Sequence, residues 1–215
     1  MNNAVTQANV TRFNAIADSW DDNPTRLELA RAAAGGILQN VPLTGGERAM
    51  EFGCGTGLVT ALLAPNVASV LAVDSSAGML EVLQRKADEL GLHTVQTCEE
   101  DLSRRIPQGP FDLIFSSMTL HHIEDVAGLF HRLAGALAPG GRIAVVDLEQ
   151  EDGSFHGDTA GVMHHGFDPA AVRGWLEEAR FVEARTHRVH VLNKTGADGR
   201  PHHYPIFLAT AARPA

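Results

Sequence analysis

The sequence predicts an α/β domain with a mostly parallel β-sheet that ends in an antiparallel hairpin. Five short, nearly continuous apolar segments recur along the chain with helix-like segments between them, which is typical of parallel strands buried on both faces. Two further strand-like segments near the end are joined by a turn-rich stretch without a helix, which predicts antiparallel pairing. A chain of 215 residues is long enough for one sizeable core and too short for two ordinary domains.

The chain opens with a helical cover over residues 1–43. Helices are expected over 4–18 and 25–40, and Pro24 near the start of the second suits a first helical turn. The remaining residues, 44–215, are expected to form the core of one single domain.

The core elements follow in alternating order. Parallel strands are expected near 48–53, 69–74, 94–98, 111–116 and 142–147, with helices near 57–64, 76–90 and 125–138. Pro139-Gly-Gly141 is a stop signal between the last of these helices and the fifth strand. A helix over 168–179 begins at Asp168-Pro169, which suits an N-cap. The strands 181–192 and 204–211 complete a seven-stranded sheet as a hairpin.

Composition indicates a soluble protein of a reducing compartment. Apolar residues make up 44% of the chain, yet no apolar run approaches the roughly 18 residues that would span a bilayer. The polar N-terminus lacks a secretory signal, and the two cysteines, Cys54 and Cys98, lie at predicted strand ends, as buried thiols do. We therefore expect a cytoplasmic protein without a membrane partner, present as a monomer or homodimer.

The charge balance argues against a nucleic-acid partner. The chain has 17 basic and 26 acidic residues, a net charge of −9, and its basic residues are scattered, whereas nucleic-acid binders usually carry a basic stripe. Acidic residues gather after the fifth predicted strand: Asp147, Glu149, Glu151, Asp152 and Asp158. They indicate either a solvated loop or a mouth that favours neutral or cationic substrates.

The first predicted strand ends in Glu51 and runs into the turn Gly53-Cys-Gly-Thr-Gly57. Alternate glycines let the backbone bend sharply and lie against a ligand, and the helix that follows turns its free amide groups toward the same ligand. The second strand ends in Asp74, 17 positions after Gly57, about where such folds place an acid on a pair of ribose hydroxyls. The glycine turn and the acid at the end of the second strand together predict a cofactor that contains adenosine.

Details of the turn decide between cofactors. A dinucleotide fingerprint reads G-x-G-x-x-G, but here Leu58 stands where the third glycine would fall. The Glu51 carboxylate would repel a diphosphate, whereas it could accept hydrogen bonds from a cationic ligand. The pattern favours S-adenosylmethionine and leaves a nicotinamide oxidoreductase as a distant alternative.

Four segments carry a resemblance to a known family. They are Glu51-Phe-Gly-Cys-Gly-Thr-Gly57, Asp74-Ser-Ser-Ala-Gly-Met79, Glu100-Asp-Leu102 and Phe111-Asp-Leu-Ile-Phe-Ser-Ser-Met-Thr-Leu-His-His-Ile123. In this order and spacing the chain resembles the class I SAM-dependent methyltransferases over roughly residues 45–150, and within them the small single-domain enzymes that act on small molecules. The resemblance implies a Rossmann-like fold and methyl transfer to an N, S or O atom of a small-molecule acceptor.

The resemblance also implies a set of cofactor-binding residues. They are Trp20, Glu51, Gly53, Cys54, Gly55, Gly57, Asp74, Ser75, Met79, Asp101, Leu102 and Ser116. Asp74 is expected to hold the ribose hydroxyls through both carboxylate oxygens. Asp101 resembles the residue that accepts from the adenine amino group, with Glu99 and Glu100 as competing choices. Met79 is expected on the adenine face or, alternatively, in the core.

Two expected contacts concern the methionine end of the cofactor. Ser116 ends the fourth strand, at the sheet edge that usually carries the ligand, and its backbone is expected to touch the methionine moiety. Trp20 lies in a leading segment that resembles the one whose aromatic residue folds over that end. A sulfonium beside the ring would gain about 1 kcal/mol or more when desolvated; the alternative is a buried anchor for the helix.

Four of the eleven histidines are candidate catalytic residues: His121, His122, His156 and His165. An imidazole can take a proton from an attacking thiol, phenol, imidazole or amine. Methyl transfer depends mostly on positioning and exclusion of water, so a base is optional, and packed or capping imidazoles are the alternative. His156 and His165, with His164, also raise the question of a metal; their spacing favours substrate contact or ordinary loop residues, and we assign no metal site.

Two rival functions share the cofactor half. A methyltransferase acting on a macromolecule should display a basic or extended recognition surface, which this short acidic chain lacks. A non-catalytic regulator that binds SAM or S-adenosylhomocysteine would lack an open pocket opposite the sulfonium. The acceptor itself depends on loops whose shape the sequence does not give.

Overall fold

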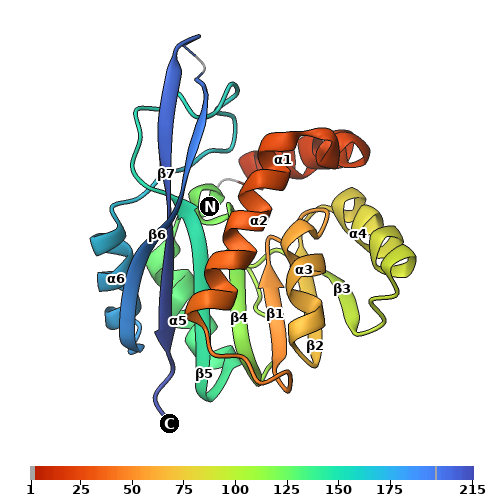
Figure 1. Cartoon of the computed structure of the whole chain (residues 1–215), viewed down its shortest axis with the longest axis vertical. Coiled ribbons are helices and arrows are strands. Elements are labelled where there is room, and N and C mark those ends of the chain that lie inside the picture. The colour runs from red at the N-terminus through yellow and green to blue at the C-terminus, as the bar shows by residue number, and fades with distance from the viewer. Residues whose placement is uncertain (1–2, 197) are drawn as a thin grey trace.

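The computed structural model describes residues 3–196 and 198–215 and centres on a seven-stranded sheet in the order β3-β2-β1-β4-β5-β7-β6 (Figure 1). The strands are β1 (Arg48–Phe52), β2 (Ser69–Asp74), β3 (Val95–Glu99), β4 (Phe111–Ser117), β5 (Leu137–Leu148), β6 (Val182–Thr195) and β7 (Pro201–Ala212). The first five are parallel, and β7 lies between β5 and β6, antiparallel to both. This topology confirms the expected Rossmann-like class I methyltransferase sheet with its C-terminal antiparallel hairpin.

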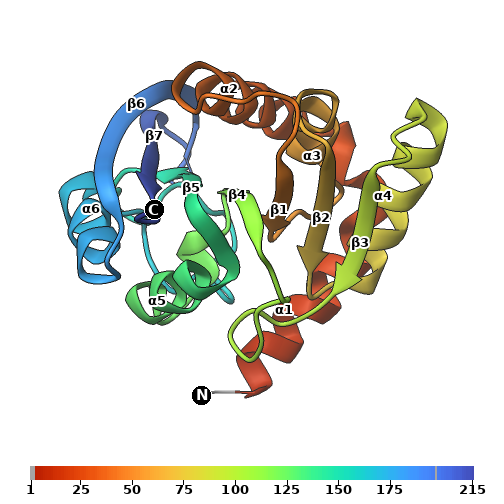
Figure 2. The ribbon, with the colours of Figure 1, turned by 90° about the horizontal axis from the view of Figure 1, so that it is seen from below.

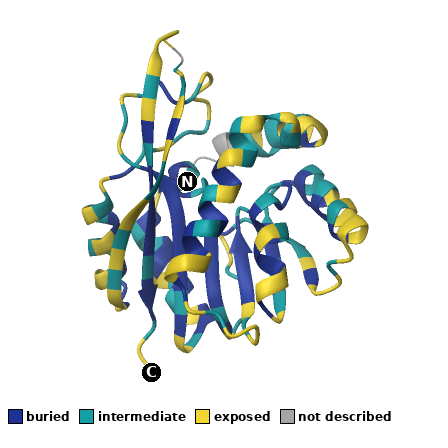
Figure 3. Ribbon diagram, in the orientation of Figure 1, coloured by how far each residue is buried: buried dark blue, intermediate teal, exposed yellow. Residues whose placement is uncertain are grey.

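Helices cover both faces of the sheet. They are α2 (Pro24–Asn40), α3 (Leu58–Leu63) and α4 (Ala77–Leu90) on one face, with α5 (Val126–Ala136) and α6 (Pro169–Glu178) on the other. Figure 2 shows α2 and α3 across the sheet from α5 and α6. Because neighbouring residues of a strand point to opposite faces, Ala49 and Met50 of β1 enter the two separate apolar cores. The inner strands β1, β4, β5 and β7 are therefore mostly buried, whereas the edge strands β3 and β6 are largely exposed or half-buried (Figure 3).

Polar caps fix where most helices begin. The Asn23 side chain accepts from the Thr25 amide, just before Pro24, and Ser76 accepts from the Met79 amide at the start of α4. Asp168 caps α6 as expected, accepting from the Ala170 amide at 2.9 Å. Each cap satisfies an amide that the helix itself leaves unpaired.

Two boundaries differ from the sequence expectation. The helix α5 ends at Ala136, and β5 begins at Leu137, so the Pro139-Gly-Gly141 stretch runs as the start of a strand. Leu137 pairs with Phe111, and the register shifts before Arg142 pairs with Leu113. The glycine signal ends the helix, but irregular pairing with β4 keeps the backbone extended.

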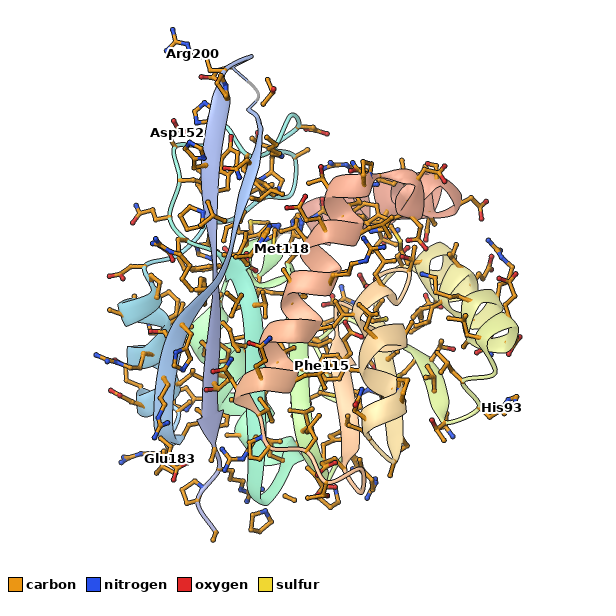
Figure 4. The ribbon with its side chains drawn as sticks, in the orientation of Figure 1. His93, Phe115, Met118, Asp152, Glu183 and Arg200 are labelled. Carbon is orange, nitrogen blue, oxygen red and sulfur yellow. The ribbon has the colours of Figure 1, made fainter. Side chains whose placement is uncertain are left out.

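The far half of the β6–β7 hairpin rises above the upper edge of the sheet, beside the 149–168 loop (Figure 1). Asp152 of this loop lies against the raised hairpin, and Arg200 lies near its end (Figure 4). Several contacts attach the loop. Among them, the Ser154 hydroxyl lies 2.8 Å from the Tyr204 hydroxyl, Lys194 Nζ donates to the Phe155 carbonyl at 2.6 Å, and Arg188 Nε donates to Glu149 Oε1 at 2.7 Å.

The helix α1 (Asn3–Ile16) lies above the upper edge of the sheet, between the raised hairpin and α4 (Figure 1), followed by a 3₁₀ helix over Ala17–Asp22. Asn14 Oδ1 accepts from the Ser76 hydroxyl at 2.7 Å and from the Gly78 amide at 2.9 Å. On the other side, Arg12 donates to the Ala160 carbonyl at 3.1 Å. Of the segment expected as an N-terminal cover, α1 bridges α4 and the 149–168 loop, whereas α2 packs on one face of the sheet.

None of the helices in the described part of the chain is both long and apolar enough to span a bilayer.

Candidate active site

A cavity of about 510 Å³ opens at the carboxyl ends of the parallel strands. Its walls come from the glycine turn, the ends of β2 and β4, the helix α1 and the 149–168 loop. This is within the range of about 300–1,000 Å³ that is usual for small-ligand sites. Met118, just beyond β4, marks its position in Figure 4.

The glycine turn approaches its neighbours closely at two of three positions. All three glycines have positive φ angles: 63° at Gly53, 53° at Gly55 and 75° at Gly57. A Cβ on Gly53 would lie 2.2 Å from Thr119 Cγ2, and one on Gly57 would lie 2.1 Å from Leu83 Cδ1. A Cβ on Gly55 would meet nothing within 4 Å. Gly53, Cys54 and Gly55 line the cavity, whereas Gly57 packs on α4 outside its lining.

Glu51 is a buried carboxyl at the floor of the cavity, with 2% of its surface exposed. One of its oxygens accepts a short hydrogen bond from the Thr60 hydroxyl. Burial raises the pKa of Glu51 to about 8, and the nearby Asp74 carboxylate adds to the rise, against the lowering effect of Thr60. A cationic group bound beside it would favour its ionised form.

Asp74 is held rigidly at the end of β2. Its Oδ2 accepts from the Gly55 amide at 2.8 Å, and its Oδ1 from the Ser76 amide at 2.9 Å. Burial raises the pKa of Asp74, while these backbone hydrogen bonds oppose the rise. Because a carboxylate oxygen can accept about two hydrogen bonds, each oxygen keeps a position for a ligand hydroxyl. Ser75, which lies between Asp74 and Ser76 in the sequence, also lines the cavity.

Three further predicted residues, Met79, Asp101 and Leu102, line the cavity. The side chains of Met79 and Leu102 are buried, and Asp101 Oδ1 accepts from the Ser103 amide at 2.9 Å. Of the competing acids, Glu100 also lines the cavity and pairs with Arg105, whereas Glu99 does not line it. The choice between Glu100 and Asp101 therefore stays open.

The predicted residue Ser116 lies one position away from the cavity wall. Its hydroxyl donates to the Phe52 carbonyl of β1 at 2.7 Å. The Ser116 side chain is therefore buried against β1 and does not line the cavity. Ser117 and Met118 line the cavity instead. Met118 has a φ of 56°, a strained value for a residue with a side chain, which often marks a functional position. No sequence signal marked Met118.

Trp20 lines the cavity, but one face of its ring is already covered by the guanidinium group of Arg26. The guanidinium carbon of Arg26 lies 3.5 Å from the centroid of the Trp20 ring, and Arg26 also donates to the Trp20 carbonyl at 3.0 Å. Phe13 meets the ring edge-on at 5.7 Å between centroids. A ligand cation would therefore use the other face or an edge of the indole.

Three of the four candidate catalytic histidines come together. The ring centroids of His121 and His122 lie 4.3 Å apart, and those of His121 and His156 lie 4.9 Å apart. All three rings line the cavity. His165 does not: its side chain is 50% exposed, with Nδ1 3.5 Å from a Glu151 oxygen. His164 Nε2 bonds the Ile123 carbonyl at 2.9 Å, also outside the cavity lining.

Asp147 is a buried partner of His121 that the sequence analysis placed only among loop acids. Its Oδ1 lies 2.8 Å from His121 Nδ1, and its Oδ2 accepts from the His121 amide at 3.3 Å. Burial alone would raise the pKa of Asp147, but the attraction of His121 and the hydrogen bonds lower it. An acid at the end of the fifth apolar segment, like Asp74 at the end of the second, was the available signal.

The other two rings of the cluster stay neutral at pH 7. Burial and the nearby His121 lower the pKa of His122 to about 4, and burial with His121 and His122 lowers the pKa of His156 to about 3. The Nδ1 of His122 lies 2.8 Å from the Gly161 carbonyl, and the buried Nδ1 of His156 has no hydrogen-bond partner in the described chain. Among residues 3–196 and 198–215, no group of three or more histidines, cysteines and acids is arranged to hold a metal.

The residues present fit a ligand that is cationic near Glu51 and carries a diol at Asp74. The nearby Lys86 ammonium is bound to Asp21 at 2.6 Å and to the Thr56 carbonyl at 2.7 Å, and although its charge acts on Glu51, it does not line the cavity, where it would have to meet a diphosphate. Open space at Gly55 leaves room for the ligand against the backbone.

Comparison with known proteins gives a family match over the same region. A family model described as a methyltransferase domain matches residues 50–145. An uncharacterized methyltransferase of Schizosaccharomyces pombe is 26% identical, over 84% of this chain and 81% of that protein. The trans-aconitate 2-methyltransferase of Pseudomonas aeruginosa is 33% identical over 73% of this chain, but the match covers 54% of that enzyme. The chain thus spans about half the length of that bacterial relative.

Solved structures agree on the fold. The DhpI–SAH complex superposes with a TM-score of 0.76 at 21% identity, covering 100% of this chain and 99% of that one. The YcgJ protein of Bacillus subtilis gives 0.72 at 16% identity, over 86% of this chain and 99% of that one. Identities this low establish a shared fold alone.

Proposed function

Because this chain belongs to the class I SAM-dependent methyltransferases, we propose that it moves a methyl group to an N, S or O atom of a small-molecule acceptor. The observation that carries the proposal is one cavity in which an acidic cradle, Glu51 and Asp74, faces a cluster of three imidazoles. When bound, S-adenosylmethionine supplies an electrophilic methyl group on sulfur and leaves as S-adenosylhomocysteine.

The cofactor half of the cavity suits that ligand residue by residue. Asp74 would hold the ribose hydroxyls through the free positions of its two oxygens, and Glu51 would face the cationic methionine end. Met79 and Leu102 would pack on the adenine, with Asp101 or Glu100 accepting from its amino group. The open approach at Gly55 would let the methionine portion lie against the turn.

The other half of the cavity supports a small acceptor. Its walls are mostly apolar or aromatic, from Phe13, Met118, Phe155 and Met163, with His121, His122 and His156 among them. The helix α1 lies over this space, which limits entry of water during transfer. A pocket of this kind disfavours a non-catalytic regulator, and the net charge of −9 disfavours a nucleic-acid acceptor.

We further propose that the enzyme works in the cytoplasm as a monomer or homodimer. The thiols of Cys54 and Cys98 are free, as expected where thiols stay reduced. Burial raises the pKa of Cys54 well above its ordinary value, and the nearby acids Asp74 and Glu51 add to the rise. This thiol therefore stays protonated and unreactive.

A two-stage experiment tests the proposed function. Calorimetry with S-adenosylmethionine, S-adenosylhomocysteine and NADH should give binding of the first two alone. Asp74→Ala should abolish it, while Asp112→Ala, which alters an acid outside the cavity lining, should not. A turnover screen of small thiols, amines, imidazoles and phenols then reads release of S-adenosylhomocysteine. Binding of NADH instead would overturn the proposal, and tight SAM binding without turnover of any acceptor would favour a regulator.

A further inference from the structure

We infer that the methyl acceptor carries a hydrogen on its nucleophilic atom, as a phenol, thiol or amine does, and that His121, positioned by Asp147, removes this hydrogen. The inference rests on the proposed function and names the acceptor class for the same cavity. It excludes an acceptor that is methylated on a carboxylate oxygen. Four steps lead to it.

The first step is the tautomer of His121. Its Nδ1 lies 2.8 Å from Asp147 Oδ1, and an ionised carboxylate can only accept. Nδ1 must therefore carry the hydrogen, which leaves a bare lone pair on Nε2 of the neutral ring. Among the side chains that the structure describes, 7–196 and 198–215, no donor reaches this Nε2, whereas the ring borders the cavity.

The second step applies the same reasoning to His122. Its Nδ1 lies 2.8 Å from the Gly161 carbonyl oxygen, another group that can only accept. His122 therefore also has its hydrogen on Nδ1 and a bare Nε2. Since the two ring centroids are 4.3 Å apart, the cavity wall presents two neighbouring acceptor nitrogens. A ligand with N–H, O–H or S–H groups can donate hydrogen bonds to these two nitrogens. A carboxylate oxygen would instead bring its own lone pairs against the lone pairs of the nitrogens.

The third step concerns the cations that could hold a carboxylate acceptor. Four of them border the cavity, and protein groups contact each one. Arg132 donates to the Leu102 carbonyl at 3.4 Å and faces Asp125 at 3.9 Å, on the side where the adenine is expected; its buried Nε has no partner in the described chain. Arg12 binds the Ala160 carbonyl and faces Asp158 at 3.6 Å. Arg26 lies on the Trp20 ring. Lys194 donates to the Phe155 carbonyl and lies 3.7 Å from the Phe155 ring centroid.

The fourth step is the fate of the proton. As the lone pair of the acceptor atom forms its new bond to the methyl carbon, the hydrogen of that atom passes to Nε2 of His121. The electron pair of the broken sulfur–methyl bond stays on sulfur. Asp147 stays ionised and stabilises the imidazolium through the 2.8 Å hydrogen bond, and the proton then leaves to water.

Groups from three different elements surround the His121 ring. Asp147 comes from β5, His122 from the turn after β4, and His156 from the 149–168 loop. Arg12 of α1 and Lys194 of β6 act on the latter two rings.

The first test needs no acceptor. Protein labelled with ¹⁵N on histidine and saturated with S-adenosylhomocysteine is measured by long-range ¹H–¹⁵N correlation, which identifies the nitrogen that carries each hydrogen. We expect the Nδ1–H tautomer at His121 and His122. In Asp147→Asn and Asp147→Ala, His121 should shift toward the Nε2–H form while His122 keeps its tautomer. An Nε2–H tautomer of His121 in the unaltered protein would overturn the inference.

The second test uses acceptors that share one aromatic ring: phenol, thiophenol, benzylamine and benzoate. We expect turnover of at least one of the first three and none of benzoate. His121→Ala should lower kcat by roughly 10²–10⁴-fold with little change in KM, and His164→Ala, which alters a histidine outside the cavity, should stay within about twofold. Methylation of benzoate, or a His121→Ala variant whose kcat stays within about twofold of the unaltered protein, would contradict the inference.

Calorimetry with S-adenosylhomocysteine separates the two levels of failure. If the unaltered protein and His121→Ala bind it equally and the wider screen finds any turned-over acceptor, the proposed function stands and a failed acceptor test concerns the inference alone. If the unaltered protein does not bind it, the proposed function itself fails. Should the Asp147 variants unfold, the tautomer of the unaltered protein and the His121→Ala kinetics still decide the matter.

Discussion

Replacing Glu51 by glutamine should make the protein more stable at alkaline pH. The folded state raises the pKa of Glu51 from 4.5 to about 8, chiefly by burial. Between these two values the unfolded chain has released the proton and the folded chain still holds it. Because the unfolded state then binds fewer protons, the free energy of unfolding falls as pH rises. The loss should be complete above about pH 8.

The magnitude follows from the size of the shift. A rise from 4.5 to about 8, at about 1.4 kcal/mol per pKa unit, corresponds to about 5 kcal/mol. In Glu51→Gln the new amide would keep the shape of the side chain and an oxygen for the Thr60 hydroxyl, but it has no proton to lose. The two proteins should therefore be similarly stable near pH 5, and the variant more stable by several kcal/mol near pH 9.

Urea unfolding at pH 5, 7 and 9 measures this difference. Using the difference between the two proteins removes the contribution of other titrating groups, such as Asp74. In addition, the unaltered protein should bind S-adenosylmethionine more tightly as pH rises to about 8, because the ionised carboxylate pairs with the cation, while the variant should show no such trend. Parallel stability curves for the two proteins across this range would refute the reasoning.

Three other changes have defined outcomes. Gly57→Ala would place a methyl group 2.1 Å from Leu83 Cδ1 and should lower the free energy of unfolding by about 2–4 kcal/mol. Gly55→Ala should lower it by only about 1 kcal/mol but should weaken SAM binding measured by calorimetry. Equal stability of the two variants would contradict this expectation. Trp20→Ala should weaken SAM binding several-fold, consistent with about 1 kcal/mol, without lowering Tm; unchanged affinity would reject its role. Tyr204→Phe loses the hydrogen bond to Ser154, so Tm should fall by the equivalent of about 1 kcal/mol. The KM for the acceptor should rise, while the affinity for SAM stays the same. A changed SAM affinity would argue against a role of this contact in the acceptor half alone.

The fold could be predicted because its signals are local. Each parallel strand shows as a short apolar run, and the missing helix between the last two strands predicts the hairpin. The extended start of β5 could not be predicted, since it depends on pairing of Leu137 with Phe111 of another strand and not on the glycines around it.

The proximity of the two acids of the proposed cofactor half could be predicted for a related reason. Parallel strands bring their carboxyl ends to the same edge, so Glu51 and Asp74 had to lie near each other. Ser116 shows the limit of such reasoning: successive strand residues point to opposite faces, and a displacement by one residue separates it from Ser117, which lines the cavity.

The acceptor half depends on contacts between distant parts of the chain. His156 reaches His121 because its loop is attached to the raised hairpin through Ser154 and Tyr204. Nothing in the loop sequence distinguishes His156 from His165, which lies outside the cavity. The Asp147–His121 pair likewise joins a strand end to a turn 26 residues earlier.

The order of strands in space has a consequence for synthesis. The strand of this sheet that is synthesised after the other six, β7, occupies an interior place between β5 and β6, and its residues Ile206 to Ala209 are almost fully buried. Until residues 201–212 emerge, β5 presents a bare edge of unpaired amides and carbonyls, which favours pairing with other chains. Nascent chains that stall before this point should therefore depend on chaperones more than the finished protein does.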